Sequence, residues 1–356
     1  MMKKNALIAM SGGVDSSVAA LLMKREGYEL TGCTMKLYTN KDIGVCKGHT
    51  CCSLDDILDA RAVAERLDMP YYVFNLIDSF KEKVIDRFVL CYESGITPNP
   101  CIDCNRYMKF DLLYDRAKQL GCDYIVTGHY ARIEKDDSGY RLLKAVDETK
   151  DQSYVLYQMT QEELAGTRFP LGCLTKKEVR EIARENGFLN ADKHDSQDIC
   201  FVPDGDYVAA LKRISGKDYK TGDFVDKAGN VLGRHRGIVA YTIGQRKGLG
   251  IAADRPLYVC GIDVKNNLVI LGDDEDLYSK SVDVKDVNWI SGLIPVNPIC
   301  CKVKIRYRMK EQEGVIYPGE NNTAHIEFKK PQRAVTPGQA AVFYEGDVVL
   351  GGGIII

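Results

Sequence analysis

Short apolar runs and apolar repeats at helical spacing alternate along the first third of the chain. The apolar runs of strand length cover residues 5–10, 30–36, 71–76 and 124–126. This alternation predicts a parallel α/β sheet of at least these strands. Ser11, Lys36 and residues 127–129 follow three of the runs, so we expect them at the carboxyl edge of the sheet, where open α/β sheets bind ligands.

The pattern changes after Tyr130. A hairpin is expected around Asp137-Ser138-Gly139, followed by helical stretches to about Gly187 that include residues 175–186. After Gly222, short β runs alternate with turn residues. We therefore expect an α/β parallel-sheet domain, a small central β-containing module and a C-terminal β-barrel-like domain. Their expected boundaries are residues 1–204, 205–278 and 279–356.

A glycine-rich loop follows the first predicted strand. Ser11-Gly12-Gly13-Val14-Asp15-Ser16-Ser17 opens a helical segment, where glycines permit a tight turn and the free amides of a helix start attract anions. The loop lacks the lysine of a Walker A loop and the spacing of a dinucleotide fingerprint, which disfavours phosphoryl-transfer NTPases and Rossmann oxidoreductases. It resembles the pyrophosphate loop of ATP-dependent adenylating enzymes, so we expect the parallel-sheet domain to bind an adenine nucleotide. An ordinary glycine-rich turn is the alternative interpretation.

Composition narrows the class of protein. The chain has 356 residues and a formal net charge of −2, so a polyanionic partner would be held by local basic surface. No apolar stretch approaches the roughly 20 residues that a membrane helix requires, and no signal peptide is recognised, so we expect a cytoplasmic protein without a membrane partner. In such a protein the 13 cysteines are read as buried thiols, ligands or nucleophiles rather than as a disulfide framework.

Two cysteine-bearing loops differ from the scattered cysteines. One is the proline-stiffened run from Thr97 to Asn105, which contains Cys101 and Cys104 and lies between two helical patterns. The other is the polar run from Asp195 to Phe201, which contains Cys200. Loops carried on a rigid sheet concentrate catalytic groups, so Cys104 and Cys200 are candidates for chemistry. The remaining cysteines outside these loops read as small buried hydrophobes: Cys33, Cys91, Cys122, Cys173, Cys260, Cys300 and Cys301.

Taken together, these motifs resemble the tRNA-specific 2-thiouridylase family, which converts the C2 oxygen of the wobble uridine to sulfur. The resemblance runs along nearly the whole chain. Its motifs are Ala9 to Ser16, Thr97 to Asn105, Thr127-Gly128-His129-Tyr130, Lys150-Asp151-Gln152-Ser153-Tyr154 and Asp195 to Phe201. The resemblance implies ATP and Mg²⁺ as cofactors, the anticodon stem-loop of tRNA as a partner, and a sulfur-donor protein, either a cysteine desulfurase or a sulfur relay.

The resemblance also implies roles for individual residues. Cys104 would be the nucleophile and Cys200 the persulfide carrier. Contacts to ATP would come from Ala9, Met10, Ser11, Gly12, Gly13, Val14, Asp15, Ser16, Met35 and Gly128. The target base would be touched by Asn99, Pro100 and Cys101. Contacts to tRNA would come from Lys150, Asp151, Gln152, His129, Arg306, Tyr307 and Gln339.

The chemistry explains why these parts occur together. A uracil C2 carbonyl is a poor electrophile, and its adenylation supplies an AMP leaving group before sulfur attacks. A persulfide on Cys200 can deliver its terminal sulfur directly, or Cys104 can attack the inner sulfur and release hydrosulfide. Either route ends in a disulfide that must be reduced before the next turnover. Magnesium would bridge the ATP phosphates, with Asp15 as a candidate ligand.

The cysteines leave two metal hypotheses open. The commoner family loop has aspartate where this chain has Cys101, so Cys101, Cys104 and Cys200 are a candidate ligand set for an iron–sulfur cluster that binds the sulfur donor. The alternative is simple persulfide transfer, because a Cys-x-x-Cys pair is equally a redox motif. Separately, Cys46, His49, Cys51 and Cys52 have the composition of a zinc site with irregular spacing.

Basic residues alternate with apolar ones near residue 306. Lys302, Lys304, Arg306, Arg308 and Lys310 lie two positions apart, which predicts five cations on one face of a strand. Such a ridge would follow phosphates without reading sequence, although a solvated strand face is the plain alternative. His129, at a strand end, is either a general base, an RNA contact or a histidine packed at the sheet edge.

Three functions compete at this stage. An ATP-dependent tRNA sulfurtransferase uses every motif. Another pyrophosphate-loop ligase or amidotransferase would leave Cys104 and Cys200 without a role, and a non-enzymatic RNA-binding metalloprotein would leave the phosphate loop unexplained.

Overall fold

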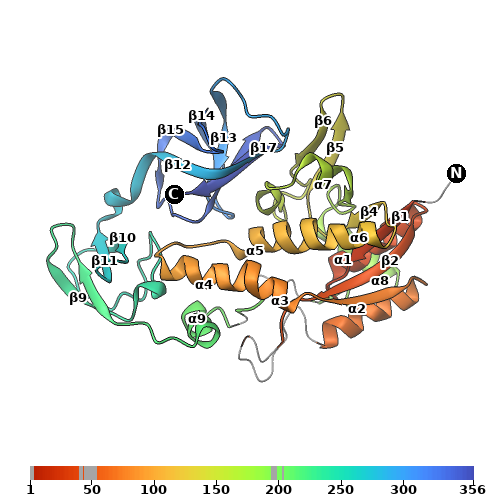
Figure 1. Ribbon diagram of the computed structural model, residues 1–356, viewed down its shortest axis with the longest axis horizontal. Helices are drawn as coiled ribbons and strands as arrows, with labels where there is room; N and C mark the ends of the chain where they lie inside the picture. Colours follow the sequence, from red (N-terminus) through yellow and green to blue (C-terminus); the bar gives the residue numbers. More distant parts are fainter. Residues whose placement is uncertain (1–3, 40–42, 44–53, 194–198, 203) are drawn as a thin grey trace.

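Five parallel strands form the N-terminal sheet in the computed structural model (Figure 1), which describes residues 4–39, 43, 54–193, 199–202 and 204–356. The strand order is β3-β2-β1-β4-β7. Their bounds are β1 (Asn5–Ala9), β2 (Glu29–Lys36), β3 (Tyr71–Asn75), β4 (Tyr124–Val126) and β7 (Thr167–Arg168). The predicted parallel sheet is confirmed. Only β7 is new, because two residues are too few to form a recognisable apolar run.

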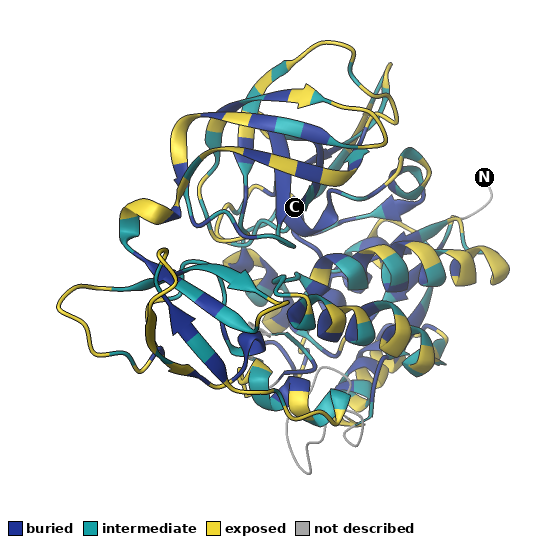
Figure 2. Cartoon of the chain, turned by 60° about the vertical axis from the view of Figure 1, so that its left-hand side comes forward, coloured by how far each residue is buried: buried dark blue, intermediate teal, exposed yellow. Residues whose placement is uncertain are grey.

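Helices cover both faces of this sheet. Successive side chains of β1 point to opposite faces, so Ala6 and Ile8 pack into one core cluster and Leu7 packs into another. The first face is covered by α1 (Val14–Arg25), α2 (Leu54–Arg66) and α8 (Lys176–Glu185). The second is covered by α5 (Pro100–Asp103), the π-helical η2 (Cys104–Leu113) and α6 (Tyr114–Gln119). Figure 2 shows the buried residues of these helices on the sides that face inward.

The central module packs against a rod of three consecutive helical segments of the N-terminal domain. That rod consists of α3 (Ile77–Phe80), the π-helical η1 (Lys81–Ile85) and α4 (Asp86–Glu93). The module contains α9 (Tyr207–Ser215), β8 (Gly222–Val225), β9 (Val231–His235), the short η4 (Ile238–Ala240), β10 (Tyr258–Asp263) and β11 (Leu268–Gly272). Its strand order is β10-β11-β8-β9. Phe224 and Val259 from its strands share one core cluster with Phe88 from α4, so the module and the rod are packed as one body.

The C-terminal strands form a barrel. They are β12 (Tyr278–Trp289), β13 (Ile299–Lys304), β14 (Gln312–Pro318), β15 (Ala324–Arg333), β16 (Ala340–Glu345) and β17 (Val348–Ile355), and the short η5 (Asp274–Leu277) precedes them. β12 pairs with both β15 and β17, which closes the sheet on itself. Trp289 and Phe343 pack inside, with ring centroids 5.5 Å apart. The predicted β-containing central module and C-terminal barrel are thus both present.

A hairpin of the N-terminal domain joins the barrel. β5 (Arg132–Asp136) and β6 (Gly139–Leu143) form the hairpin expected around Asp137-Ser138-Gly139. β6 then pairs antiparallel with β17, placing Leu143 opposite Val348 and Leu142 opposite Val349. The remaining elements near this junction are η3 (Ser153–Leu156) and α7 (Gln161–Ala165). Across the part of the chain that the structure describes, no helix combines the length and apolar character needed to cross a bilayer.

Candidate active site

The phosphate loop joins β1 to α1 at the carboxyl edge of the sheet. Gly12 has a φ of 74°, and a Cβ at this position would overlap the backbone of Asp56 at the start of α2. Only glycine fits this turn without strain. Gly13 is the N-cap of α1 and has no side chain, so the first amides of the helix are left for a ligand.

Serine side chains fix the shape of the loop. The Ser16 hydroxyl accepts a hydrogen bond from the Ser11 amide at 3.2 Å and donates to the Gly13 carbonyl at 3.1 Å. The Ser17 hydroxyl donates to the same carbonyl at 3.0 Å. These contacts hold the loop in its shape.

Gly128 brings a second strand end against this loop. It follows β4, and a Cβ added to it would lie 2.8 Å from the Ser16 amide nitrogen. β1 and β4 are neighbours at the point where the strand order reverses, which is the usual ligand position in open α/β sheets. Of the predicted ATP contacts, residues 9–16 and Gly128 therefore share one location, and Met35 lies at the same edge near the end of β2.

Asp15 is already engaged by two side chains. Its carboxylate accepts hydrogen bonds from the Lys176 ammonium, at 2.8 Å to each oxygen, and from the Tyr130 hydroxyl at 2.8 Å. Its Oδ1 accepts two of these hydrogen bonds and its Oδ2 accepts one, so the carboxylate keeps acceptor capacity for a metal ion.

The segment that leads toward Cys200 is tied to the phosphate loop. The Asn190 amide donates to the Gly12 carbonyl and to the Ser17 hydroxyl, both at 3.0 Å. The Lys193 ammonium pairs with Asp56 at 2.6 Å and with Asp59 at 2.7 Å. The chain that carries the second thiol thus passes directly beside the proposed nucleotide site.

Cys104 follows a helical turn with a well-defined start. Asn99 is the N-cap of α5, and its side chain accepts a hydrogen bond from the Cys101 amide at 3.2 Å, while Pro100 occupies the first helical position. The Gln339 side chain of the barrel donates to the Thr97 carbonyl at 2.8 Å. The loop is therefore held from the barrel side as well as by its own helix.

Cys104 and Cys200 lie against the same hydrophobic cluster, even though 96 positions separate them in the sequence. The Tyr38 hydroxyl, just beyond β2, donates to the Cys200 carbonyl at 2.7 Å. Phe201 packs edge-on against Phe80 and Phe88, with centroid distances of 5.9 and 5.1 Å. The hydrogen bond to its own carbonyl and the packing of the neighbouring Phe201 thus fix the backbone of Cys200 next to the cluster that Cys104 also contacts.

Cys101 lies in a different environment. It is exposed, whereas Cys104 and Cys200 are partly buried. Among the described residues, no three His, Cys, Asp or Glu side chains converge as a metal site. Cys101, Cys104 and Cys200 are therefore not arranged as cluster ligands in this conformation. The candidate zinc ligands Cys46, His49, Cys51 and Cys52 lie outside the described residues.

The predicted tRNA contacts gather around the barrel edge. The Tyr307 hydroxyl donates to the Asp151 carbonyl at 3.2 Å, and Gln339 reaches the Thr97 loop. Lys150 precedes Asp151 in the same turn, and the Gln152 side chain accepts a hydrogen bond from the Tyr130 amide at 2.9 Å. Of these residues, Gln339 contacts the Thr97–Asn105 loop directly.

The predicted five-cation strand is wrong beyond Lys304. β13 ends at that residue, and the chain then turns instead of continuing the ladder. Arg306 bends inward, where its guanidinium donates to the carbonyls of Ile243 at 3.2 Å and Ala334 at 2.8 Å. The alternation of basic and apolar residues continued past the strand end because Ile305 packs into the barrel core from the turn.

His129 is buried and not displayed to solvent. Its Nδ1 lies 2.6 Å from the Thr127 hydroxyl and its Nε2 lies 3.2 Å from the Lys109 ammonium, between the rings of Phe110 and Phe169. Burial and the Lys109 charge together hold the pKa of His129 well below its usual range. It is the packed histidine that the sequence also allowed, and an RNA contact by His129 is not part of the function proposed below.

This burial predicts a pH dependence of stability. Below about pH 6.5 the unfolded chain binds a proton at His129 and the native protein does not, so stability falls by up to about 1.4 kcal/mol per pH unit. His129→Gln should remove that component. Urea midpoints measured at pH 7.5 and 5.5 should therefore differ more for the wild type than for the variant. Equal differences would show that His129 is protonated in the native protein.

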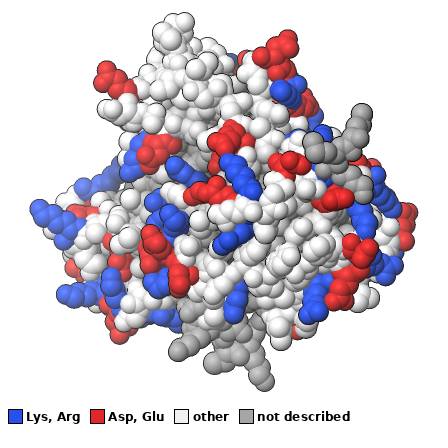
Figure 3. Space-filling model, turned by 45° about the vertical axis from the view of Figure 1, so that its right-hand side comes forward, with Lys and Arg blue, Asp and Glu red and all other residues white. Residues whose placement is uncertain are grey.

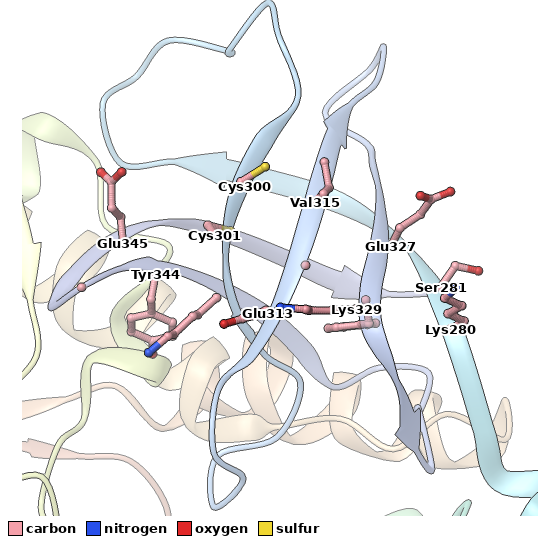
Figure 4. A pocket seen from close by; sticks show the side chains of 14 residues that line it. Lys280, Ser281, Cys300, Cys301, Glu313, Val315, Glu327, Lys329, Tyr344 and Glu345 are labelled. Atoms are coloured by element: carbon pink, nitrogen blue, oxygen red, sulfur yellow. Dashed lines mark hydrogen bonds and ion pairs between the residues drawn. The ribbon is translucent and has the colours of Figure 1, made fainter.

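A cavity of about 920 Å³ lies apart from these groups, on the barrel (Figure 4). Its wall includes Cys300, Lys302, Glu313, Lys329 and Glu345, with Lys329 and Glu313 paired at 2.8 Å. None of the predicted nucleotide or base contacts lines it. On the face in Figure 3, basic and acidic side chains are interspersed, in keeping with 48 basic and 50 acidic residues in the chain.

Sequence reasoning missed several residues that shape the site. Tyr38, Lys176 and Asn190 carried no motif of their own, and Tyr130 stood in a motif without an expected role. Each reaches the site only because the fold brings it there.

The chain is similar to known proteins along its whole length. Family models match residues 4–204 (tRNA methyl transferase HUP domain), 209–273 (tRNA methyl transferase PRC-barrel domain) and 279–355 (Aminomethyltransferase beta-barrel domain). The tRNA-specific 2-thiouridylase MnmA of Clostridioides difficile is 51% identical, covering 99% of this chain and 98% of its own. That of Acetivibrio thermocellus is 50% identical over the full length of both. A solved 4-thiouridine synthetase–RNA complex with bound ATP aligns over 60% of this chain and 53% of its own, at 18% identity and a TM-score of 0.34.

Proposed function

The chain belongs to the tRNA-specific 2-thiouridylase family, and we propose from that membership that it adenylates the C2 oxygen of wobble uridine 34 and replaces it with sulfur. It is a tRNA-uridine 2-sulfurtransferase that uses ATP. The observation that supports the residue-level proposal is the packing of Cys104 and Cys200 against one cluster beside the sheet edge that bears the phosphate loop.

In the first half-reaction, the uracil O2 attacks the α-phosphorus of ATP. The new bond is O2 to phosphorus, the bond to the β-phosphate breaks, pyrophosphate leaves with the electron pair, and the N3 proton of uracil is lost. The phosphate loop, Met35 and Gly128 would hold the nucleotide, and Asn99, Pro100 and Cys101 would hold the base. Mg²⁺ would neutralise the phosphates, with Asp15 as a candidate ligand.

In the second half-reaction, the terminal sulfur of a Cys200 persulfide replaces AMP at C2. By the direct route, that sulfur attacks C2, AMP leaves, and the Cys104 thiolate then attacks Cys200 Sγ, releasing 2-thiouridine and forming the Cys104–Cys200 disulfide. By the other route, Cys104 first releases hydrosulfide, which attacks C2. In both, two cysteines are oxidised and the transferred sulfur is reduced, so an external two-electron reductant is needed for each turnover.

Persulfide transfer is preferred here to an iron–sulfur cluster. Cys104 and Cys200 contact one hydrophobic cluster, whereas Cys101 is exposed, and among the described residues no three His, Cys, Asp or Glu side chains are arranged to hold a metal ion. A sulfur-donor protein, a cysteine desulfurase or a sulfur relay, would load Cys200. Lys150, Asp151, Gln152, Tyr307 and Gln339 would position the anticodon stem-loop, and we expect a cytoplasmic location because tRNA is the substrate.

Each of the two alternative functions leaves one feature of the molecule without a role. A ligase or amidotransferase gives the two anchored thiols no task, and an RNA-binding metalloprotein gives the phosphate loop none.

Thionucleoside analysis of tRNA from cells that lack this protein tests the proposal. We expect 2-thiouridine at position 34 to disappear while 4-thiouridine is unchanged, and unchanged 2-thiouridine would refute it. Protein purified without oxygen should be active without bound iron; activity that tracks iron content would instead favour the cluster.

A further inference from the structure

Three cations surround the ring of Tyr107. The ammonium of Lys83 lies 5.4 Å from the ring centroid, and the guanidinium carbons of Arg87 and Arg106 lie 5.5 and 5.2 Å from it. Lys83 and Arg87 come from the rod of η1 and α4, whereas Arg106 comes from η2, as Tyr107 does. Two helical segments thus bring their positive side chains to one ring, and we call Lys83, Arg87 and Arg106 the Tyr107 cation cluster.

The Tyr107 cation cluster carries more positive charge than its neighbours neutralise. Asp103 pairs with Arg87, with Oδ2 3.6 Å from Nε. Within the part of the chain that the structure describes, neither Lys83 nor Arg106 forms an ion pair. Lys83 and Arg87 also lie four positions apart in one rod, a spacing at which like charges repel each other along a helix. An anion bound between the three head groups would compensate this repulsion.

The ring itself does not account for the arrangement. A cation gains attraction from an aromatic ring when it lies over one of the two faces, so a single ring does not compensate three neighbouring charges. The chain as a whole has a formal net charge of −2, so a local excess of positive charge is not a general property of its surface. The cluster therefore indicates a specific anionic partner.

The cluster lies next to the nucleophile in the fold. Arg106 and Tyr107 follow Cys104 by two and three positions on η2. Tyr107 packs against the same hydrophobic cluster as Cys104 and Cys200. The Thr97–Asn105 loop, which would hold the target base, ends one residue before Arg106. A nucleotide held there by its base carries its own phosphates one sugar away, so an anion site beside the loop fits the RNA backbone.

The residue types favour a phosphodiester as the anion. A guanidinium presents its donors in a planar fork that matches two phosphate oxygens, and an ammonium adds a point charge. The ring of Tyr107 is surrounded by these cations, so it is not displayed as a platform for stacking a base. Such a site binds the backbone and positions the RNA without reading its sequence.

We propose that Lys83, Arg87 and Arg106 bind a backbone phosphate of the anticodon loop beside the target uridine. The proposal rests on the function proposed above and adds to it a phosphate site that none of the predicted tRNA contacts includes. The three side chains are positioning residues, because they contact the RNA and no reacting atom. Tyr107 keeps their head groups together between the two helical segments.

The salt dependence of RNA binding separates a phosphate contact from a structural role. Each phosphate that a cation neutralises on a single-stranded RNA contributes about −0.7 to the slope of log K against log salt concentration. Lys83→Met and Arg106→Met should each weaken binding of an unmodified anticodon stem-loop RNA by about 3- to 10-fold, and each should make the slope less negative by about 0.7. Fluorescence anisotropy titrations at several KCl concentrations measure both quantities.

Lys177→Met is the matched control, because it removes one positive charge from the opposite side of the sheet. Lys177 lies on α8, which covers the face that η2 does not, and its side chain is 85% exposed. It should leave the affinity and the slope unchanged. Arg106→Lys keeps the charge, so it should keep most of the slope, and it guards against a failure of Arg106→Met to fold.

An unchanged slope for both methionine variants would overturn the proposal, and so would an equal change for Lys177→Met. Loss of affinity in Arg106→Lys as large as that in Arg106→Met, with the slope retained in both, would show that the arginine is structural and would also overturn it. Failure of the proposed function has a different signature, because the wild-type protein would then produce no 2-thiouridine, whatever the cluster variants do.

Discussion

Replacing Cys200 with serine should reduce thiolation by a factor of about 10³ or more while leaving the fold and tRNA affinity nearly unchanged. A serine hydroxyl cannot carry a persulfide, so sulfur has no route to C2. The fold should persist because the hydrogen bond from Tyr38 to the Cys200 carbonyl at 2.7 Å and the packing of the neighbouring Phe201 do not depend on the replaced sulfur. Thionucleoside yield, urea midpoint and tRNA dissociation constant are the three measurements.

Two further substitutions sharpen this test. Cys104→Ser should also abolish thiolation but still release one equivalent of pyrophosphate, because adenylation precedes the step that needs Cys104. Cys101→Ser distinguishes the sulfur routes: persulfide transfer leaves most of the activity, whereas a cluster would lose a ligand. Cys173→Ser, at an exposed position outside the site, is the control. Full activity of Cys200→Ser would remove Cys200 from the mechanism.

Gly12→Ala should weaken ATP binding by about 100-fold or more. The residue has a φ of 74°, and an added Cβ would overlap the backbone of Asp56, which cannot rotate away. Moving the loop costs about 3 kcal/mol or more, which corresponds to about 100-fold in affinity. The Kd for ATP from titration calorimetry gives this directly, and the urea midpoint gives the accompanying loss of stability.

Gly121→Ala separates the backbone penalty from the steric one. Gly121 has a φ of 72° but nothing within 4 Å of the added Cβ. It should lose only about 1 kcal/mol of stability and keep its ATP affinity. If both variants lost stability equally and Gly12→Ala bound ATP as tightly as the wild type, the contact with α2 would be unimportant for the shape of the loop.

The parallel sheet was predictable because its strands are apolar on both faces. Ala6, Leu7 and Ile8 are all fully buried, and such continuous runs are visible without the fold. β7 was not predictable, since two residues carry no periodicity. The pairing of β6 with β17 was equally hidden, because sequence spacing does not reveal which strands meet across 200 residues.

The candidate site likewise has a part that could be predicted from the sequence and a part that could not. Motifs located the phosphate loop and both thiols, since these residue types are rare in those arrangements. The supporting contacts from Lys176, Tyr130 and Asn190 depend on distances between remote elements. The prediction of a five-cation strand around Arg306 was wrong because basic and apolar residues continue to alternate through a turn. Only the hydrogen bonds from Arg306 to the carbonyls of Ile243 and Ala334 reveal that its guanidinium faces inward.

The ladder shared by β6 and β17 has a consequence for how a bulky RNA is admitted. Backbone pairing, the 2.8 Å ion pair between Arg132 and Asp347, and a common core that includes Leu7 and Val342 join the barrel to the sheet domain. A rotation of the barrel away from the sheet domain would break all three of these connections at once. The frame around the proposed anticodon site is therefore of fixed width, and accommodation of the incoming nucleotide falls to the short segments lining it.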